Sequence, residues 1–454
     1  MSNTSTTILH RDPSLSLYRT ATGFTAVTSV RDRNGQVVQS FFDVNESAVD
    51  LLSCIDGQRS VAEVVREFCR QKDGDPKANE PWILEFLLSL QERAVIKPGR
   101  CESPPLRIVG DEDWVRPAQM TVEITDSCNL ECGHCYLSAS PLGRRYMRLE
   151  TFRGIVAKFK ENHGLSIELT GGEVCMNPDF DDILSLALRE FSVVGVLTNG
   201  TILRDSTLEI LRSHRNHVTV GISLDSVRHD IHDRIRGRRK AFERTTRNIR
   251  RLTDAGIKVR IGAVIFEDNM WELRDLAQMA IDLGACLFSF NFVEGFGRGA
   301  DFQERSGIQI TAEYSTYIQD VLEEFEGIIP IVAGEQYQGR VNCGAGSAAI
   351  VVDASGQVRP CVLFPSTLSL GNVLTSSWED VFDQDLFKDL SRIPTPNQEH
   401  GCPATCPLFA TCYRCYLKGL AANMSKSPEE RCPWVHKNSL HRFVDAFAER
   451  GWRS

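Results

Sequence analysis

Three cysteines, Cys128, Cys132 and Cys135, stand close together in the spacing CxxxCxxC. Cysteine thiolates bind zinc and iron–sulfur clusters, and a closed site of either kind takes four protein ligands. Because this segment offers three, it predicts a metal centre with one position left open to bind and activate a ligand. A zinc site is the alternative, and it would need a fourth ligand from elsewhere in the chain.

A second group of seven cysteines lies nearer the end of the chain. The sequence holds fifteen cysteines, and ten of them fall into these two groups. In a reducing compartment such thiols are interpreted as metal ligands or reactive groups before disulfides. A zinc ribbon could use four of the seven and would leave three without a role. The seven are Cys343, Cys361, Cys402, Cys406, Cys412, Cys415 and Cys432.

Three polar motifs follow apolar, strand-like runs downstream of the triplet. The first is Thr170-Gly171-Gly172-Glu173, whose glycines let backbone approach a ligand closely and whose carboxylate can pair with an ammonium group. Leu197-Thr198-Asn199-Gly200 follows the next run, and Ser223-Leu224-Asp225 the one after it. Each motif is weak evidence alone, and their order after the cysteines makes the set informative.

The triplet and these motifs together resemble the radical S-adenosylmethionine (SAM) enzymes. The resemblance implies a [4Fe–4S] cluster on the three cysteines, with SAM chelated by the fourth iron. One electron then breaks the C5′–S bond, and a 5′-deoxyadenosyl radical abstracts hydrogen from substrate. His134 stands where the family usually has an aromatic residue, and we interpret it as packing against the cluster. The resemblance assigns SAM's amino group to Gly171, Gly172 and Glu173, and its methionyl and ribose parts to Asn199, Ser223 and Asp225.

The seven later cysteines resemble the SPASM domain, which houses auxiliary iron–sulfur clusters. Its usual middle spacing is CxxCx5CxxxC, whereas this chain has CxxxCx5CxxC. The resemblance implies two auxiliary clusters. One would take four thiolates and the other three, which leaves the inner cluster with an open iron, a non-cysteine ligand or a substrate thiolate. The four-thiolate set is Cys402, Cys406, Cys412 and Cys432, and the three-thiolate set is Cys343, Cys361 and Cys415.

Cys175 lies two residues after Glu173, where the family more often has proline or an apolar residue. We favour simple packing beside the SAM pocket. The alternative is a catalytic thiol that donates hydrogen to a substrate radical, which a peptide epimerase requires.

From Met120 onward, short β-rich runs alternate with amphipathic helical patterns, which predicts a parallel α/β sheet. Six such strands fit the partial (β/α)6 barrel of radical SAM enzymes, a TIM-like fold with functional residues at the carboxyl ends of its strands. The strand-like runs begin at Thr121, Ser166, Val193, Val218, Val259 and Leu287.

Residues 10–95 form a separate pattern of a hairpin and three helices. Asn34-Gly35 between two β-rich runs predicts the hairpin turn. Asn45 and Ser60 are expected to cap the first two helices, and the third is expected from about Glu80. This winged-helix-like unit could bind DNA, but it has no basic recognition helix. It resembles the RiPP recognition element, which holds a leader peptide as an added strand along a sheet edge.

The whole chain of 454 residues has a net charge of -9, which argues against nucleic acid as a main partner. The basic stretch from Arg228 to Arg251 is interpreted as a solvated helix face. No apolar run is long enough for a membrane span and no signal peptide is recognisable, so we expect a cytoplasmic protein. The expected divisions are a recognition domain at 10–95, a linker at 96–117, a radical SAM core at 118–330 and a SPASM domain at 335–440.

These features predict a radical SAM oxidoreductase that modifies a ribosomally synthesised precursor peptide. Oxidative thioether or carbon–carbon cross-linking is preferred, because auxiliary clusters can carry away an electron. The alternatives are peptide epimerisation, maturation of a partner enzyme's subunit, and a non-catalytic iron–sulfur scaffold. An external electron donor such as flavodoxin or ferredoxin is expected as a partner.

Overall fold

The computed structural model divides into two compact units, Met1–Arg116 and Pro117–Ser454, which are described separately. The predicted turn at 33–36 and the linker residues 112–115 lie outside the described residues. So do 335–341, where the SPASM domain was expected to begin. The structure describes residues 4–20, 23–31, 37–111, 116–308, 310–333, 342–364, 369–382, 389–390, 392–403, 405–406, 412 and 415–449.

The first unit contains the expected hairpin and three helices, together with four short strands that the sequence analysis did not predict. Asn45 caps the first helix, and Ser60 and Glu63 form a capping box at the second. The third helix begins earlier than the expected Glu80, because Asp75 caps it and Pro76 opens its first turn. The elements are η1 Thr4–Thr6, β1 Leu9–Arg11, β2 Ser16–Thr20, β3 Gly23–Arg31, β4 Val37–Val44, α1 Glu46–Cys54, α2 Val61–Gln71, α3 Pro76–Glu92, β5 Ile96–Pro98 and β6 Arg107–Val109.

The strands of this unit form two sheets. One has the order β4-β3-β2-β6 with β4 at its edge, and β1 pairs with β5 in the other. The helices bury Leu51, Val64 and Leu87 in a core that they share with Leu17 and Phe24 of β2 and β3. This unit therefore has a hydrophobic core of its own.

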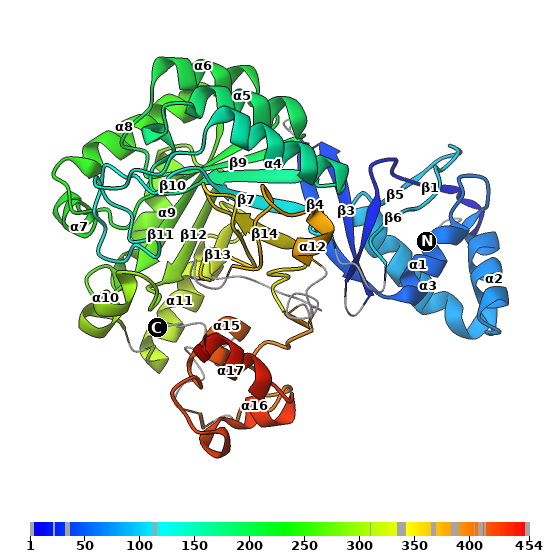
Figure 1. Ribbon diagram of the computed structural model, residues 1–454. Coiled ribbons are helices and arrows are strands. Elements are labelled where there is room, and N and C mark those ends of the chain that lie inside the picture. Colours follow the sequence, from blue (N-terminus) through cyan, green and yellow to red (C-terminus); the bar gives the residue numbers. More distant parts are fainter. Residues whose placement is uncertain are drawn as a thin grey trace. The chain divides into compact units, whose positions relative to one another are not determined.

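The second unit is built on one nine-stranded sheet with the order β13-β12-β11-β10-β9-β8-β7-β14-β15. The six predicted strands are β7 to β12, and every neighbouring pair among them is parallel. Helices cross between them, and Figure 1 shows α4, α5, α6 and α8 covering one face of the sheet. The strands are β7 Gln119–Glu123, β8 Ser166–Thr170, β9 Val193–Thr198, β10 Val218–Ser223, β11 Lys258–Ile265, β12 Leu287–Phe292, β13 Ile331–Ala333, β14 Ala349–Val352 and β15 Val358–Arg359.

Three of these strands extend the predicted set of six. β13 adds to β12, and β14 pairs in parallel with β7, which brings the C-terminal region beside the strand that precedes the cysteine triplet. The helices of this unit are α4 Leu149–Glu161, η2 Val174–Met176, α5 Phe180–Glu190, α6 Asp205–Ser213, α7 His229–Ile235, α8 Ala241–Asp254, η3 Met270–Glu272, α9 Leu273–Asp282, α10 Gly299–Ser306, α11 Ala312–Glu324, α12 Trp378–Phe382, α15 Tyr416–Ala421, η5 Pro428–Glu430, α16 Pro433–Lys437 and α17 His441–Glu449.

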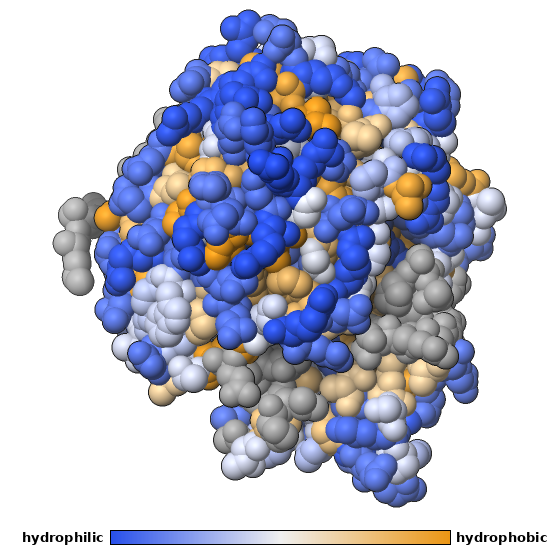
Figure 2. All heavy atoms as spheres, turned by 90° about the vertical axis from the view of Figure 1, so that its left-hand side faces the viewer, coloured by the Kyte–Doolittle hydropathy of each residue, from blue (hydrophilic) through white to orange (hydrophobic). Residues whose placement is uncertain are grey.

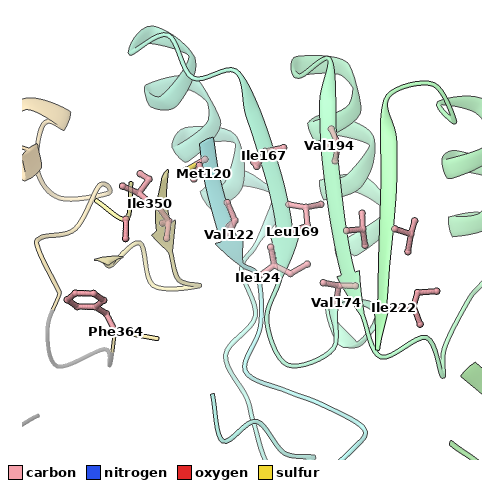
Figure 3. Packing of buried hydrophobic residues seen from close by; sticks show 14 of the residues in the cluster. Met120, Val122, Ile124, Ile167, Leu169, Val174, Val194, Ile222, Ile350 and Phe364 are labelled. Atoms are coloured by element: carbon pink, nitrogen blue, oxygen red, sulfur yellow. The ribbon is translucent and has the colours of Figure 1, made fainter. Parts of the chain in front are cut away.

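The two faces of the sheet differ in chemistry because side chains alternate along each strand. Met120 and Val122 of β7 point toward the helices with Leu169 of β8, as Figure 3 shows, and all three are fully buried. The opposite face carries polar residues. There Glu168 of β8 lies across from Gly195, and Arg260 of β11 lies across from Gly221. Parallel strands buried on both faces are usually apolar throughout, so this polar face indicates a functional interior.

The basic stretch from Arg228 to Arg251 covers α7 and α8. Arg247 and Arg250 are exposed on α8, whereas Ile249 and Leu252 are buried beneath it. Figure 2, turned to face this side of the molecule, shows a mostly hydrophilic surface. The exposed side of α8 is therefore solvated, as expected, whereas Arg236 in the same stretch is buried. Among the described residues no helix has both the length and the apolar character needed to cross a membrane.

Candidate iron–sulfur and SAM site

The cysteine triplet lies in the loop that leaves the carboxyl end of β7. Cys128 and Cys132 are buried, and Cys135 is partly buried. Cys128 and Cys132 share one buried cluster with Leu130 and Ala139, and Cys135 packs against it. Burial raises the pKa of the Cys128 thiol to about 12. Metal binding to such thiols must displace their protons.

Hydrogen-bond donors from distant segments converge on the sulfur atoms of this loop. Asn199 Nδ2 donates to Cys128 Sγ at 3.7 Å, and Arg236 Nη1 donates to Cys132 Sγ at the same distance. The backbone N–H of Leu130 also donates to Cys128 Sγ, at 3.4 Å. Donors of this kind stabilise negative charge on thiolates.

The two glycines after β8 let one loop pack directly on the cysteine loop. A Cβ at Gly171 would stand 2.3 Å from the Thr125 carbonyl oxygen, and one at Gly172 would stand 2.3 Å from that of Ser127. Gly171 also has φ +137°, which L side chains rarely adopt. The close approach that the sequence predicted is therefore an approach to the protein's own backbone. A contact of these glycines with SAM stays a prediction.

Glu173 connects the ends of β8 and β9. Its fully buried carboxylate accepts hydrogen bonds from Thr198 Oγ1 at 2.7 Å, from the backbone N–H of Asn199 at 2.8 Å and from that of Cys175 at 3.2 Å. Burial raises the pKa of this carboxyl group. A carboxylate has about four acceptor positions, so a further donor such as an ammonium group could still bind.

Two other predicted SAM contacts lie at the end of β10. Ser223 is the last residue of that strand and is partly buried. Asp225 is fully buried, and both of its oxygens face the Arg236 guanidinium, with Nη2 to Oδ1 at 2.9 Å and Nε to Oδ2 at 2.7 Å. The N–H of Arg236 Nε does not point at Asp225 Oδ2 well enough to form a hydrogen bond. Oδ2 therefore keeps an unused acceptor position. The sequence analysis missed Arg236, whose only signal was its place in a basic stretch.

Cys175 is buried in η2, and its thiol donates to the carbonyl oxygen of Ile202 at 3.5 Å. Burial raises the pKa of this thiol, and the nearby Glu173 carboxylate raises it further. The thiol therefore stays protonated and hydrogen-bonded within the protein, which is compatible with the packing interpretation. Its role in catalysis stays a prediction.

The loop after β12 also contacts the cysteine loop, through hydrogen bonds from Arg298. Arg298 Nε donates to the Cys132 carbonyl oxygen at 2.9 Å, and Nη2 donates to that of Ala139 at 2.8 Å. Gly297 allows this contact, because a Cβ there would stand 2.3 Å from the Tyr136 carbonyl oxygen. The Arg298 guanidinium thus holds the backbone of the cysteine loop at two points. Its neighbour Glu294 pairs with Lys418 at 2.5 Å.

The seven C-terminal thiols gather in two sets. Burial raises the pKa of Cys361, and the thiols of Cys343 and Cys415 raise it further. Burial raises the pKa of Tyr416, and the same three thiols raise it further. This tyrosine is fully buried, and its hydroxyl donates to the Ala345 carbonyl oxygen at 3.2 Å. Sequence reasoning missed this tyrosine, although it directly follows Cys415.

The second set is centred on Cys412. Burial raises the pKa of its thiol to about 12, and Cys432, Cys406, Cys402 and Cys415 raise it further, so Cys415 lies close to both sets. Asn423 Nδ2 donates to Cys432 Sγ at 3.3 Å. Within the described residues, no group of three or more histidine, cysteine or acidic side chains is arranged closely enough to hold a single metal ion. Which thiols an iron–sulfur cluster takes in each set stays a prediction.

The residues around the triplet fit a cluster and a polar ligand. Three soft thiol donors lie on one loop and pack in one cluster, which suits iron–sulfur chemistry. Ser127 Oγ, His134 Nδ1 and Asp225 Oδ2 are buried around this loop without hydrogen-bond partners among the described residues. Buried polar atoms without partners are costly, and a bound polar ligand would satisfy them.

Two family models match this chain. Residues 122–280 match the radical SAM superfamily, and residues 343–416 match an iron–sulfur cluster-binding domain named SPASM. The antilisterial bacteriocin subtilosin biosynthesis protein AlbA of Bacillus subtilis is 37% identical over 407 residues, which is 89% of this chain and 90% of that protein. The sporulation killing factor maturation protein SkfB of the same species is 28% identical over 61% of this chain and 67% of its own.

Among solved structures, Streptococcus suis SuiB bound to its precursor peptide SuiA has a TM-score of 0.61 at 17% identity. The match covers 94% of this chain and 98% of that one. At this identity the likeness shows the fold, which includes the small N-terminal unit as well as the barrel and the C-terminal domain.

Proposed function

Because the chain belongs to the radical SAM/SPASM family of peptide maturases, we propose that it forms an oxidative cross-link within a ribosomally synthesised precursor peptide. The link is a thioether or a carbon–carbon bond. The observation that carries this proposal is the match of residues 343–416 to the SPASM iron–sulfur cluster-binding domain, a segment that holds six of the seven C-terminal thiols. A net oxidation must remove an electron from the substrate, and auxiliary clusters provide for this, whereas epimerisation involves no net oxidation.

In this proposal the [4Fe–4S] cluster is held by Cys128, Cys132 and Cys135. When reduced, this centre supplies a 5′-deoxyadenosyl radical from SAM that abstracts hydrogen from the peptide. The protein's own part is to orient SAM and peptide and to exclude water. Glu173 and Asn199, which lie at adjacent strand ends and share a hydrogen bond of 2.8 Å, form one side of the SAM site.

Mass spectrometry tests the reaction. The native protein is coexpressed with the peptide encoded by a short open reading frame beside its gene, and the triplet-cysteine variant Cys128→Ala/Cys132→Ala/Cys135→Ala is the control. We expect the peptide to lose two hydrogens with the native protein only. An unchanged mass with deuterium uptake from D2O would indicate epimerisation instead and would contradict the proposal.

Replacing Cys175 also distinguishes cross-linking from epimerisation. A cross-linking enzyme needs no hydrogen donor, so the Cys175→Ala protein should give the same product. An epimerase that used this thiol would lose its product with the same substitution.

We propose that the first unit binds the leader part of the precursor as a strand along β4, the edge of its larger sheet. Hydrogen–deuterium exchange of the full chain, with and without a synthetic leader peptide, tests this. Slower exchange is expected in the amides of Val37–Val44. Protection confined to β6 or to the helices would contradict the proposed edge.

The two sets of C-terminal thiols are proposed to hold two auxiliary clusters. The inner one would have only the three thiolates Cys343, Cys361 and Cys415. Iron analysis and EPR spectroscopy of the triplet-cysteine variant check this, since that variant keeps only the auxiliary sites. Four-cysteine ligation of both clusters would contradict an incomplete inner site.

The remaining proposals concern organisation and partners. The division at 10–95, 96–117, 118–330 and 335–440 is proposed as recognition domain, linker, barrel and SPASM domain. A flavodoxin or ferredoxin is proposed as the electron donor, and its ability to replace dithionite in forming 5′-deoxyadenosine tests this directly.

A further inference from the structure

A buried ion pair stands behind the cysteine triplet. The side chains of Arg236 and Asp225 are 8% and 0% exposed, and their charged groups meet at 2.7 and 2.9 Å. Replacing such a pair by apolar residues is often neutral or stabilising, so stability alone gives little reason for its presence. Its position beside Cys132 offers a functional reason.

The backbone around Arg236 fixes it against the cysteine loop. Arg236 is the C-cap of α7, and its carbonyl oxygen accepts from the N–H of Glu131 at 3.3 Å. The carbonyl oxygen of Ile235 accepts from the N–H of Gly133 at 3.1 Å. The next residue, Gly237, has φ +64°, and a Cβ there would stand 2.8 Å from the Glu131 carbonyl oxygen. The end of α7 is therefore docked on both sides of Cys132.

Asp225 is fixed just as firmly. Its Oδ1 accepts from the backbone N–H of Val264 at 3.1 Å in addition to Arg236. Its own N–H donates to His232 Nδ1 at 3.2 Å, and its carbonyl oxygen accepts from Asn269 Nδ2 at 2.6 Å. The pair with this fixed carboxylate helps to hold the guanidinium in the orientation in which Nη1 donates to Cys132 Sγ at 3.7 Å.

We propose that Arg236 is a positioning residue that donates a charge-assisted hydrogen bond to the Cys132 thiolate and raises the reduction potential of the SAM-binding cluster, and that Asp225 acts by holding Arg236. This inference rests on the proposed function, since it requires a cluster at the triplet. Hydrogen bonds to the sulfur ligands and nearby charge are established determinants of cluster potential. A cation beside the ligand stabilises the reduced cluster, which carries one more negative charge. In this role Asp225 acts on the cluster through Arg236, and a contact of its Oδ2 with SAM stays a separate prediction.

The test uses the double variant Arg236→Gln/Asp225→Asn, which removes both charges and leaves neither one buried alone. The matched control is Arg228→Gln/Glu272→Gln. It removes an ion pair of 2.7 Å at the start of α7, away from the end that docks on the cysteine loop. The midpoint potential of the SAM cluster is measured by EPR-monitored redox titration without SAM and without peptide. Signals of the auxiliary clusters are subtracted with the triplet-cysteine variant.

We expect the midpoint potential to shift to a lower value in the double variant and to stay at the native value in the control. Arg236→Lys keeps the positive charge but not the planar set of donors, so it should lower the midpoint potential by a smaller amount. If the double variant loses its iron, the potential of Arg236→Lys tests the inference in its place.

An unchanged potential in a variant with a full cluster would overturn the inference. So would a loss of SAM affinity in Asp225→Asn at the native potential, because that result belongs to a ribose contact. The measurement needs no peptide, so its outcome is distinct from failure of the proposed cross-linking.

Discussion

At the residue scale, the site depends on small residues that let loops meet. Gly171 and Gly172 bring the loop after β8 onto the cysteine loop, and Gly297 does the same for the loop after β12. In each case the nearest atom to an added Cβ is a backbone oxygen, which cannot rotate away as a side chain can. The precision of the site therefore comes from backbone contacts as much as from ligating side chains.

Gly172→Ala should destabilise the protein by about 1–3 kcal/mol, because its Cβ would overlap the Ser127 carbonyl oxygen. It should also lower the iron content of the triplet site. Gly154→Ala is the matched control, since no atom lies within 4 Å of its added Cβ on α4, and it should stabilise by about 0.5–1 kcal/mol. Urea unfolding and iron analysis measure both effects. Equal stability of the two variants would show that the two loops can separate without cost.

At the element scale, the addition of β14 and β15 joins the C-terminal region to the barrel. β14 pairs with β7 in parallel, and Arg359 of β15 forms a buried ion pair with Glu123 at the carboxyl end of β7. The Arg359 guanidinium also donates to the Phe364 carbonyl oxygen at 2.6 Å. These contacts fix the segment between Cys343 and Cys361 beside the strand that leads into the triplet.

Removing one partner of this pair should be costly. Arg359→Met leaves the Glu123 carboxylate buried without its cation and should cost about 3–5 kcal/mol, whereas Arg359→Met/Glu123→Gln should recover most of that loss. Burial raises the pKa of Glu123 and Arg359 opposes the rise. In the single variant that pKa rises further, so its stability should improve as pH falls and the carboxyl group takes up a proton. Urea unfolding at several pH values checks this. A single variant as stable as the double one at neutral pH would contradict it.

At the scale of the whole molecule, the chain combines two units with separate cores. Leu17, Phe24 and Leu51 belong to the core of the first unit, and the large cluster around β7 to β12 belongs to the second. All ten predicted metal-ligating cysteines lie in the second unit. In the proposed function, radical generation belongs to the second unit and leader recognition to the first.

A variant beginning at Pro117 should still form 5′-deoxyadenosine from SAM, because it keeps the whole barrel and its cysteines. Its KM for the precursor peptide should rise about tenfold or more, since even 1.4 kcal/mol of lost leader binding has that effect. Steady-state kinetics with full-length and leaderless peptide measure it. An unchanged KM for the full-length peptide would contradict leader binding by the first unit.

The sequence alone determined the class of the fold and the regions of chemistry. Alternating β-rich and helical runs identified β7 to β12, and the motifs follow those strands because parallel strands end at one edge of a sheet. The cysteine triplet and the Gly-Gly-Glu motif could be recognised because each lies within a few consecutive residues. Short strands such as β14 carry too little periodicity to be predicted.

Only the tertiary structure decided what the polar residues contact. Arg236 lies about a hundred residues from Cys132, and Arg298 is farther still, yet both bind the same loop. Glu173 and Asp225 both accept hydrogen bonds from groups far away in the sequence, and their contact with SAM stays a prediction. The physical reason is that a charged side chain is buried only with a partner, and which partner it meets depends on how distant loops pack.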